Sequence, residues 1–166
     1  MNKITIVLLN PSDWSVYKTI QLEALKEDPA AFGASYKEWS SFSDQKWQER
    51  PNNPDSRIFI AKDSDKPIGL LGVYFHIVEN EEVADIWGMY VNQGYRKKGI
   101  AKMLLSHAFD SIRQKGLKKA QLMVEYNPTP AQHLYKSVGF QPIKTLDYVL
   151  GDGKKHQLYE MEKILS

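Results

Sequence analysis

The sequence contains no cysteine, few histidines and no long apolar run. Without cysteine, the chain can form no disulfide bond, thiolate metal site or cysteine nucleophile. His76 and His107 lack a second ligand at metal spacing, so we expect packing roles for both and no metal site. No stretch has the length of a membrane span, and the N-terminus has no apolar run of signal-peptide length. We therefore expect a cytoplasmic protein without a membrane partner.

The chain also has little net charge, because 22 lysines and arginines oppose 20 aspartates and glutamates. This balance gives no indication of a polyelectrolyte partner. The charges are nevertheless unevenly placed, since residues 94–119 are strongly basic and residues 79–85 are acidic. The basic segment suits an anionic ligand, and the acidic segment suits a cationic one.

At 166 residues, with 42% apolar and 25% charged residues, the chain has the composition of an ordinary globular protein. We expect one domain across residues 1–166, with a mixed α/β fold. Strands are predicted at residues 4–9, 58–61, 68–78, 83–91 and 120–126, and a closing hairpin at 140–164. Helices are predicted at residues 13–28, 100–115 and 129–138, with short helical pieces within 30–56.

A short basic turn, Arg96-Lys97-Lys98-Gly99, lies between a predicted strand and the predicted helix that begins at Ile100. A helix N-terminus offers unpaired backbone N–H groups and the positive end of the helix dipole. Gly99 allows an anion to approach the backbone, and the three cations raise the local potential. The turn is therefore predicted to bind a phosphate group.

Two common classes of phosphate-binding protein do not fit this turn. Gly94 and Gly99 have the GxxxxG spacing of a P-loop, but Ile100-Ala101 replaces the lysine and hydroxyl residue that hold the terminal phosphate and Mg²⁺. The GxGxxG dinucleotide fingerprint is also absent. The sequence thus disfavours an NTPase and an enzyme with that dinucleotide motif.

The basic turn resembles the signature of the GNAT superfamily of acetyl-CoA-dependent N-acyltransferases, (Arg/Gln)-x-x-Gly-x-(Gly/Ala), which residues 96–101 match. Residues 127–140 resemble the second GNAT motif, with Asn127, Tyr135 and Gly139 at its key positions, although the Asn-to-Tyr spacing is one residue longer than usual. Both motifs in order are more specific than either alone. The resemblance implies a GNAT-type fold, with a mixed, mostly antiparallel sheet of about six or seven strands flanked by about four helices.

The resemblance also implies acetyl-CoA as co-substrate, lying in a V-shaped gap between the strands at 83–91 and 120–126. In this arrangement one strand backbone pairs with the pantetheine, while the helix N-terminus and its cations hold the pyrophosphate. The residues that the resemblance assigns to the cofactor are Met89, Val91, Arg96, Lys97, Lys98, Gly99, Ile100, Ala101 and Asn127.

Acetylation of an amine needs a base for the ammonium proton and an acid for the departing thiolate. Tyr135 resembles the general acid of the family; the alternative is a buried tyrosine on the face of a helix. Asp85 stands where many relatives carry Glu, and strict alternation places it on the same face as Trp87 and the cofactor-pairing residues. Glu125 is the second candidate base, acting through water. Either carboxylate could instead be a solvated charge at a strand end.

The aromatic residues Phe32, Tyr36 and Trp39 are candidates to line the acceptor site, or else to cover a sheet edge. Together with the acids at 79–85, they fit a cationic amine that carries an apolar part. Polyamines, aminoglycosides, amino acids and protein N-termini all remain open as acceptors.

We therefore expect an N-acetyltransferase that moves an acetyl group from acetyl-CoA to a small-molecule amine or a peptide amino-terminus, by direct attack in a ternary complex. The alternatives are a non-catalytic acyl-CoA-binding sensor of the same fold and a nucleic-acid binder that uses the basic face at 96–119. The last is disfavoured, because that face lacks interleaved exposed aromatics. The edge strands and the closing hairpin leave a homodimer open.

Overall fold

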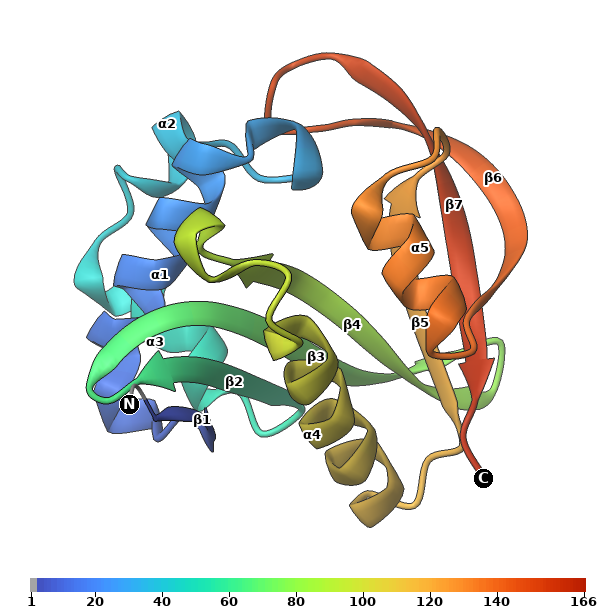
Figure 1. Cartoon of the computed structure of the whole chain (residues 1–166), viewed down its shortest axis with the longest axis horizontal. Helices are drawn as coiled ribbons and strands as arrows, with labels where there is room; N and C mark the ends of the chain where they lie inside the picture. The colour runs from blue at the N-terminus through green and yellow to red at the C-terminus, as the bar shows by residue number, and fades with distance from the viewer. Residues whose placement is uncertain (1–2) are drawn as a thin grey trace.

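The structure is a computed structural model that describes residues 3–166, and its centre is a seven-stranded sheet (Figure 1). The strand order is β1-β2-β3-β4-β5-β7-β6, and all neighbours are antiparallel except β4 and β5. The mixed α/β fold with a mostly antiparallel sheet is therefore confirmed. The strands are β1 (Ile4–Leu8), β2 (Ser56–Asp63), β3 (Lys66–Val78), β4 (Glu81–Val91), β5 (Lys119–Glu125), β6 (Gln141–Val149) and β7 (Lys155–Ile164).

The described residues form five α-helices, where about four were predicted. The additional helix arises because Ser35 and Ser43 each accept a hydrogen bond from a backbone N–H three residues later, so that residues 35–52 form two separately capped helices. None of the helices in residues 3–166 has the length and apolarity needed to cross a membrane. The helices are α1 (Trp14–Glu27), α2 (Tyr36–Trp39), α3 (Asp44–Asn52), α4 (Ile100–Gln114) and α5 (Pro130–Ser137).

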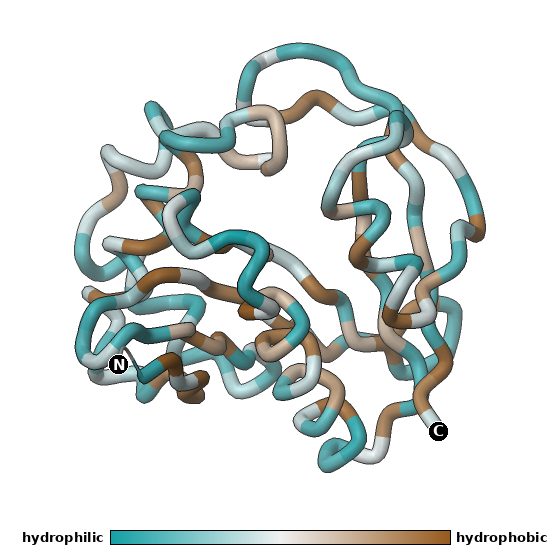
Figure 2. The backbone as a smooth tube through the Cα atoms, in the orientation of Figure 1, coloured by the Kyte–Doolittle hydropathy of each residue, from teal (hydrophilic) through white to brown (hydrophobic). Residues whose placement is uncertain are grey.

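Helices cover both faces of the sheet. Helices α4 and α5 pack with the larger apolar core on one face, and α1 and α3 enclose the smaller core on the other. Hydropathy follows this division, since apolar residues concentrate along the strands while the turn that leads into α4 is hydrophilic (Figure 2). The sheet is thus buried between two layers, and the basic turn remains at the surface.

The buried face of α4 differs from the predicted one. Met103 and His107 were expected to face the core, but both are exposed. Leu105 and Phe109 are buried in their place. The physical reason is that α4 packs not only on the sheet but also against the C-terminal half, where Phe109 lies 6.0 Å from the ring of Phe140. This second contact rotates the apolar stripe of the helix.

A β-bulge interrupts β4 near its centre. Its register with β3 passes from Trp87 opposite Gly72 to Tyr90 opposite Leu70, so β4 has one residue more than β3 in this interval. Gly88 adopts a φ of +67° there, a left-handed conformation that favours glycine.

The bulge reverses which side chains of β4 face each layer. Trp87 packs with the core beside α1, and Asp85 lines a cavity on that same side. Met89 and Val91 pack instead with the core beside α4. The expectation that Asp85 shares a face with Met89 and Val91 is therefore wrong, because strict alternation does not continue through a bulge.

Strands β4 and β5 meet only at one end. Their parallel register covers Ala84 opposite Ala120 and Asp85 opposite Gln121. Beyond these pairs the strands diverge, as Figure 1 shows. From residue 86 to residue 91, the β5 side of β4 consequently has no strand partner in the register.

Candidate active site

The open edge of β4 leads to the basic turn at the start of α4. Both Lys97 and Gly99 have positive φ, +62° and +79°, and the first helical hydrogen bond runs from the Met103 N–H to the Gly99 carbonyl. The preceding amides therefore lack partners within the helix. A Cβ built on Gly99 would have no atom within 4 Å, so the space above this backbone is open. Alternating backbone conformations with free N–H groups form a concave anion site.

Arg96 ties the basic turn to two neighbouring elements. Its Nε donates to the Val91 carbonyl at 2.8 Å, and its Nη2 pairs with Asp28 at 2.6 Å. These contacts fix the turn to the end of β4 and to the end of α1. Arg96 therefore holds the loop, and the roles of Arg96, Lys97 and Lys98 as cations of the phosphate site remain predictions.

Replacing Lys97 by glutamate is expected to weaken CoA binding at least about 10-fold, because it reverses a charge beside the helix N-terminus. Isothermal titration calorimetry measures the affinity, and circular dichroism checks the fold. The matched control is Lys118→Glu, which reverses an exposed lysine beyond the other end of α4. Equal affinity in Lys97→Glu and in the control would remove the turn from the cofactor site.

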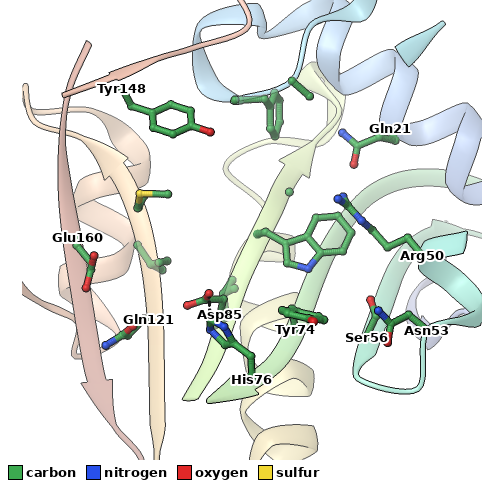
Figure 3. A pocket seen from close by; sticks show the side chains of 18 of the residues that line it. Gln21, Arg50, Asn53, Ser56, Tyr74, His76, Asp85, Gln121, Tyr148 and Glu160 are labelled. Carbon is green, nitrogen blue, oxygen red and sulfur yellow. Dashed lines mark ion pairs between the residues drawn. The ribbon is translucent and has the colours of Figure 1, made fainter. Parts of the chain in front are cut away.

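A cavity of about 840 Å³ opens on the α1 side of the sheet, beside the divergence of β4 and β5. Side chains from helices α1–α3 and strands β2–β7 line it, and Figure 3 shows many of them pointing inward. Ile86 of β4 and Leu122 of β5 line its floor and also belong to the core beside α4. The cavity therefore adjoins the gap between the two strands.

A histidine–aspartate pair lies in this cavity. Nε2 of His76 is 2.7 Å from Oδ2 of Asp85, and both side chains are partly exposed (Figure 3). Burial raises the pKa of Asp85, while the neighbouring His76 lowers it and the charge of Glu160 raises it further. His76 was expected to be a packing residue, and the structure corrects this by placing it beside the candidate base.

Only one of the acids predicted to attract a cationic acceptor lines the cavity. That residue is Asp85, whereas Glu81 forms an ion pair with Lys119 at the far end of the sheet. The reason is that β4 begins at Glu81, so the earlier acids lie in and next to the hairpin turn.

Aromatic residues line part of the cavity, and two of the three residues predicted for the acceptor site are among them. Phe32 and Trp39 line the cavity, whereas Tyr36 is 41% exposed and does not. Tyr36 lies outside the cavity because its position at the start of α2 turns it to the surface, and its role at the acceptor site remains a prediction. Trp87 adds a third aromatic wall and lies flat on β3, where a Cβ on Gly72 would come within 2.0 Å of its ring.

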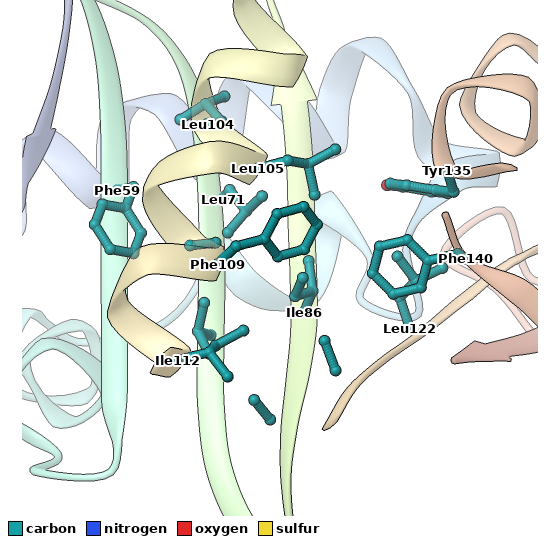
Figure 4. Close-up of a cluster of buried hydrophobic side chains, with 14 of the residues drawn as sticks. Phe59, Leu71, Ile86, Leu104, Leu105, Phe109, Ile112, Leu122, Tyr135 and Phe140 are labelled. Carbon is teal, nitrogen blue, oxygen red and sulfur yellow. The ribbon is translucent and has the colours of Figure 1, made fainter. Parts of the chain in front are cut away.

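Tyr135 is 6% exposed and lies in the core on the other side of the sheet opening. Its ring packs edge-on against Phe140 at 5.9 Å, and its hydroxyl points from α5 toward the side of α4 and β4 (Figure 4). Burial raises the pKa of Tyr135, so the hydroxyl keeps its proton over the physiological range.

Glu125 and Asn127 lie near the C-terminal hairpin. Oε2 of Glu125 is 3.1 Å from Nδ1 of His156, whose other ring nitrogen is 2.8 Å from Asp152. Glu125 therefore ties β5 to the β6–β7 hairpin and does not line the cavity. Asn127 is exposed in the loop before α5, and its role as a cofactor ligand remains a prediction.

Comparison with known proteins gives one family and partial relatives. A sequence model described as the acetyltransferase (GNAT) family matches residues 21–140. Streptothricin acetyltransferase from Streptomyces lavendulae is 33% identical over 86 residues, which make up 52% of this chain and 45% of that protein. The chain thus covers less than half of the length of this relative.

Solved structures share the fold over nearly the whole chain. A GNAT-family acetyltransferase from Streptococcus pneumoniae has a TM-score of 0.80 at 18% identity, covering 98% of this chain and 100% of that one. Spermidine N-acetyltransferase from Vibrio cholerae, in complex with CoA and spermine, has a TM-score of 0.75 at 21% identity, covering 97% and 95%. At these identities the likeness is one of fold.

Proposed function

The chain belongs to the acetyltransferase (GNAT) family, and we propose that it transfers an acetyl group from acetyl-CoA to a primary amine by direct attack in a ternary complex. The observation that carries this proposal is the divergence of β4 and β5 next to a large cavity. The gap offers an unpaired strand edge to the pantetheine, and the cavity offers a place for the amine. Two ligands that approach from opposite sides of a sheet opening can meet there without a covalent enzyme intermediate.

The cofactor lies along the open edge of β4. The backbone at Met89 and Val91 pairs with the amides of the pantetheine in the manner of an added strand. The amides of residues 98–101 and the side chains of Arg96, Lys97 and Lys98 hold the pyrophosphate at the N-terminus of α4. CoA as a ligand of this fold is supported by the Vibrio cholerae complex.

Asp85 acts as the base in this proposal. The acceptor enters as an ammonium, which has no lone pair, so its proton must leave before the nitrogen can attack. The carboxylate of Asp85 takes that proton, and His76 at 2.7 Å stabilises the ionised carboxylate beforehand. The free amine then forms a bond to the thioester carbonyl carbon, giving a tetrahedral intermediate.

Tyr135 acts as the acid for the leaving group. When the tetrahedral intermediate collapses, the C–S bond breaks and the sulfur departs as a thiolate. The Tyr135 hydroxyl gives its proton to that sulfur. The attacking nitrogen loses its second proton, which returns to Tyr135 through solvent, and Asp85 releases to solvent the proton that it took, so that the products are the amide and CoA. The burial of Tyr135 beside Ile86 and Leu122, which also line the cavity, supports a position next to the reacting atoms.

Release of free thiol from acetyl-CoA in the presence of an amine panel tests the proposal. An acetyltransferase releases CoA only with an acceptor, and mass spectrometry then finds the acceptor 42 Da heavier, the mass that an acetyl group adds. A non-catalytic sensor of acyl-CoA would bind the cofactor in calorimetry and release no thiol with any amine.

A further inference from the structure

All but one of the charged side chains that line the cavity have an oppositely charged neighbour. Each carboxylate that lines the cavity has a cationic neighbour: Glu49 with Lys46 at 2.7 Å, Asp85 with His76 at 2.7 Å, and Glu160 with Lys144 at 3.2 Å. Arg50 also lines the cavity, and no carboxylate within residues 3–166 forms an ion pair with it. Arg50 is thus the one charged residue of the cavity lining that has no ion-pair partner among the described residues.

The guanidinium of Arg50 is held in place without being neutralised. It lies 4.5 Å from the centre of the Trp87 ring and 5.2 Å from that of Trp39, and its Nη1 is 3.5 Å from the Tyr17 hydroxyl. Figure 3 shows the Arg50 side chain pointing into the cavity. Stacking on two rings fixes the plane of the guanidinium and leaves its edge free for a planar anion.

A buried hydroxyl lies at the same end of the cavity. Ser56 lines the cavity and is 7% exposed, and its Oγ has no hydrogen-bond partner among the described residues. An unsatisfied buried hydroxyl is unfavourable. Because the Ser56 Oγ is covered in this structure, a ligand atom gains that free energy when the lining shifts to uncover it. Asn53, on the same loop, adds an amide to the lining, and Figure 3 shows it beside Ser56.

The sheet fixes the separation between this polar end and the candidate base. Ser56 pairs with Tyr74 across β2 and β3, and Tyr74 pairs with Asp85 across β3 and β4. Two strand spacings place the Ser56 and Asp85 backbones roughly 10 Å apart. A ligand that contacts Asp85 with one group and Arg50 or Ser56 with another must therefore carry those groups several bonds apart.

We propose that the acceptor is an amino-carboxylate, in which the carboxylate binds Arg50 and Ser56 while the amine several bonds away lies at Asp85. The inference rests on the proposed function and narrows its substrate class. A bidentate pair between a guanidinium and a carboxylate matches the geometry of both groups. A diamine, by contrast, would bring a second cation against Arg50.

Paired acceptors that differ only in this anion test the inference. The series runs from 3-aminopropanoate to 6-aminohexanoate, each compared with its neutral amide, and glycylglycine with glycylglycinamide represents the peptide form. We expect kcat/KM for the best acid to exceed that of its amide about 10-fold or more. We also expect 1,5-diaminopentane to be a poorer acceptor than the best acid. The inference would be overturned if the kcat/KM of an amide or of the diamine equalled or exceeded that of every acid.

Variants locate the effect at Arg50. In Arg50→Gln the ratio of kcat/KM for the acid to kcat/KM for its amide is expected to fall to about one. Arg50→Lys keeps the charge but loses the planar guanidinium, so its ratio is expected to lie between those of the wild type and Arg50→Gln. Arg113→Gln removes an arginine that pairs with Asp110 on the outer face of α4, and it is expected to keep the wild-type ratio. An unchanged ratio in Arg50→Gln with a native circular dichroism spectrum would contradict the assignment.

Calorimetry separates this inference from the proposed function. If no amine releases thiol, the proposed transfer fails, but the same acids and amides can still be titrated into the CoA-bound protein. Tighter binding of the acids, lost in Arg50→Gln, would support the carboxylate site even then. Equal binding of acid and amide would overturn it. If thiol is released and the acids and amides are equally good acceptors, the inference is overturned but the proposed acetyl transfer stands.

Discussion

Asp85→Asn is expected to lower kcat/KM by about 100-fold or more near neutral pH, and by less at alkaline pH. Burial raises the pKa of Asp85, so its carboxyl group keeps a proton to a higher pH than an ordinary aspartate. Because a carboxylate base must be ionised to act, wild-type kcat/KM rises as pH passes through this raised pKa. It rises again as the ammonium group of the acceptor loses its proton. The asparagine variant depends only on amine that is already free, so its deficit shrinks as pH rises.

The pH–rate profile of both enzymes measures this effect, with Glu125→Gln as the matched carboxylate control. Glu125 is tied to His156 outside the cavity, so its variant is expected to have the milder effect. The same proportional loss at every pH in Asp85→Asn would contradict the assignment. The assignment would also be contradicted if Asp85→Asn kept the wild-type kcat/KM while Glu125→Gln lost most of it.

Tyr135→Phe is expected to reduce kcat by about 100-fold or more while the fold and the CoA affinity survive. The phenylalanine ring keeps the packing against Phe140 and the surrounding core, so the loss reflects the missing hydroxyl. Steady-state kinetics with the best acceptor give kcat, and calorimetry gives the affinity for CoA.

Tyr159→Phe serves as the control for this change, because Tyr159 packs against the same core from β7. It is expected to retain nearly normal turnover. A Tyr135→Phe enzyme with wild-type kcat would mean that the Tyr135 hydroxyl has a structural role only, and the leaving thiolate would then need another proton donor.

The elements that carry the proposed cofactor site were predictable from sequence because they are local. A strand, a basic turn with glycine and an amphipathic helix follow one another within residues 83–115, and each depends on neighbouring residues only. The positive φ of Gly99 and the start of α4 at Ile100 agree with that reading. The ion pair between Arg96 and Asp28 could not be predicted, because Asp28 lies far away in the sequence, at the end of α1.

The acceptor half was harder to predict because it depends on how strands align. The turn between β3 and β4 consists of Glu79 and Asn80, both with positive φ, as in a two-residue hairpin of type I′. That turn pairs Tyr74 with Asp85 and puts His76 on the adjoining diagonal, within reach of the carboxylate. A longer turn was read from the sequence, and so the contact between His76 and Asp85 was missed.

Two further features of the structure were missed in the sequence. The bulge at Gly88 was hidden within a strand that otherwise alternates, although a glycine inside a strand is a known hint of a bulge. Arg50 resembled an ordinary surface residue near the end of a short polar helix. Its place in the cavity follows from the packing of α3 beside Trp87, which only the tertiary structure brings together.

A crystal structure of the protein with CoA tests the central claim most directly. The account predicts the pantetheine along the open edge of β4 at Met89 and Val91, with the pyrophosphate at the amides of residues 98–101 and the sulfur between Tyr135 and the cavity that holds Asp85. Binding of CoA elsewhere, or a sulfur remote from Tyr135 and Asp85, would contradict it.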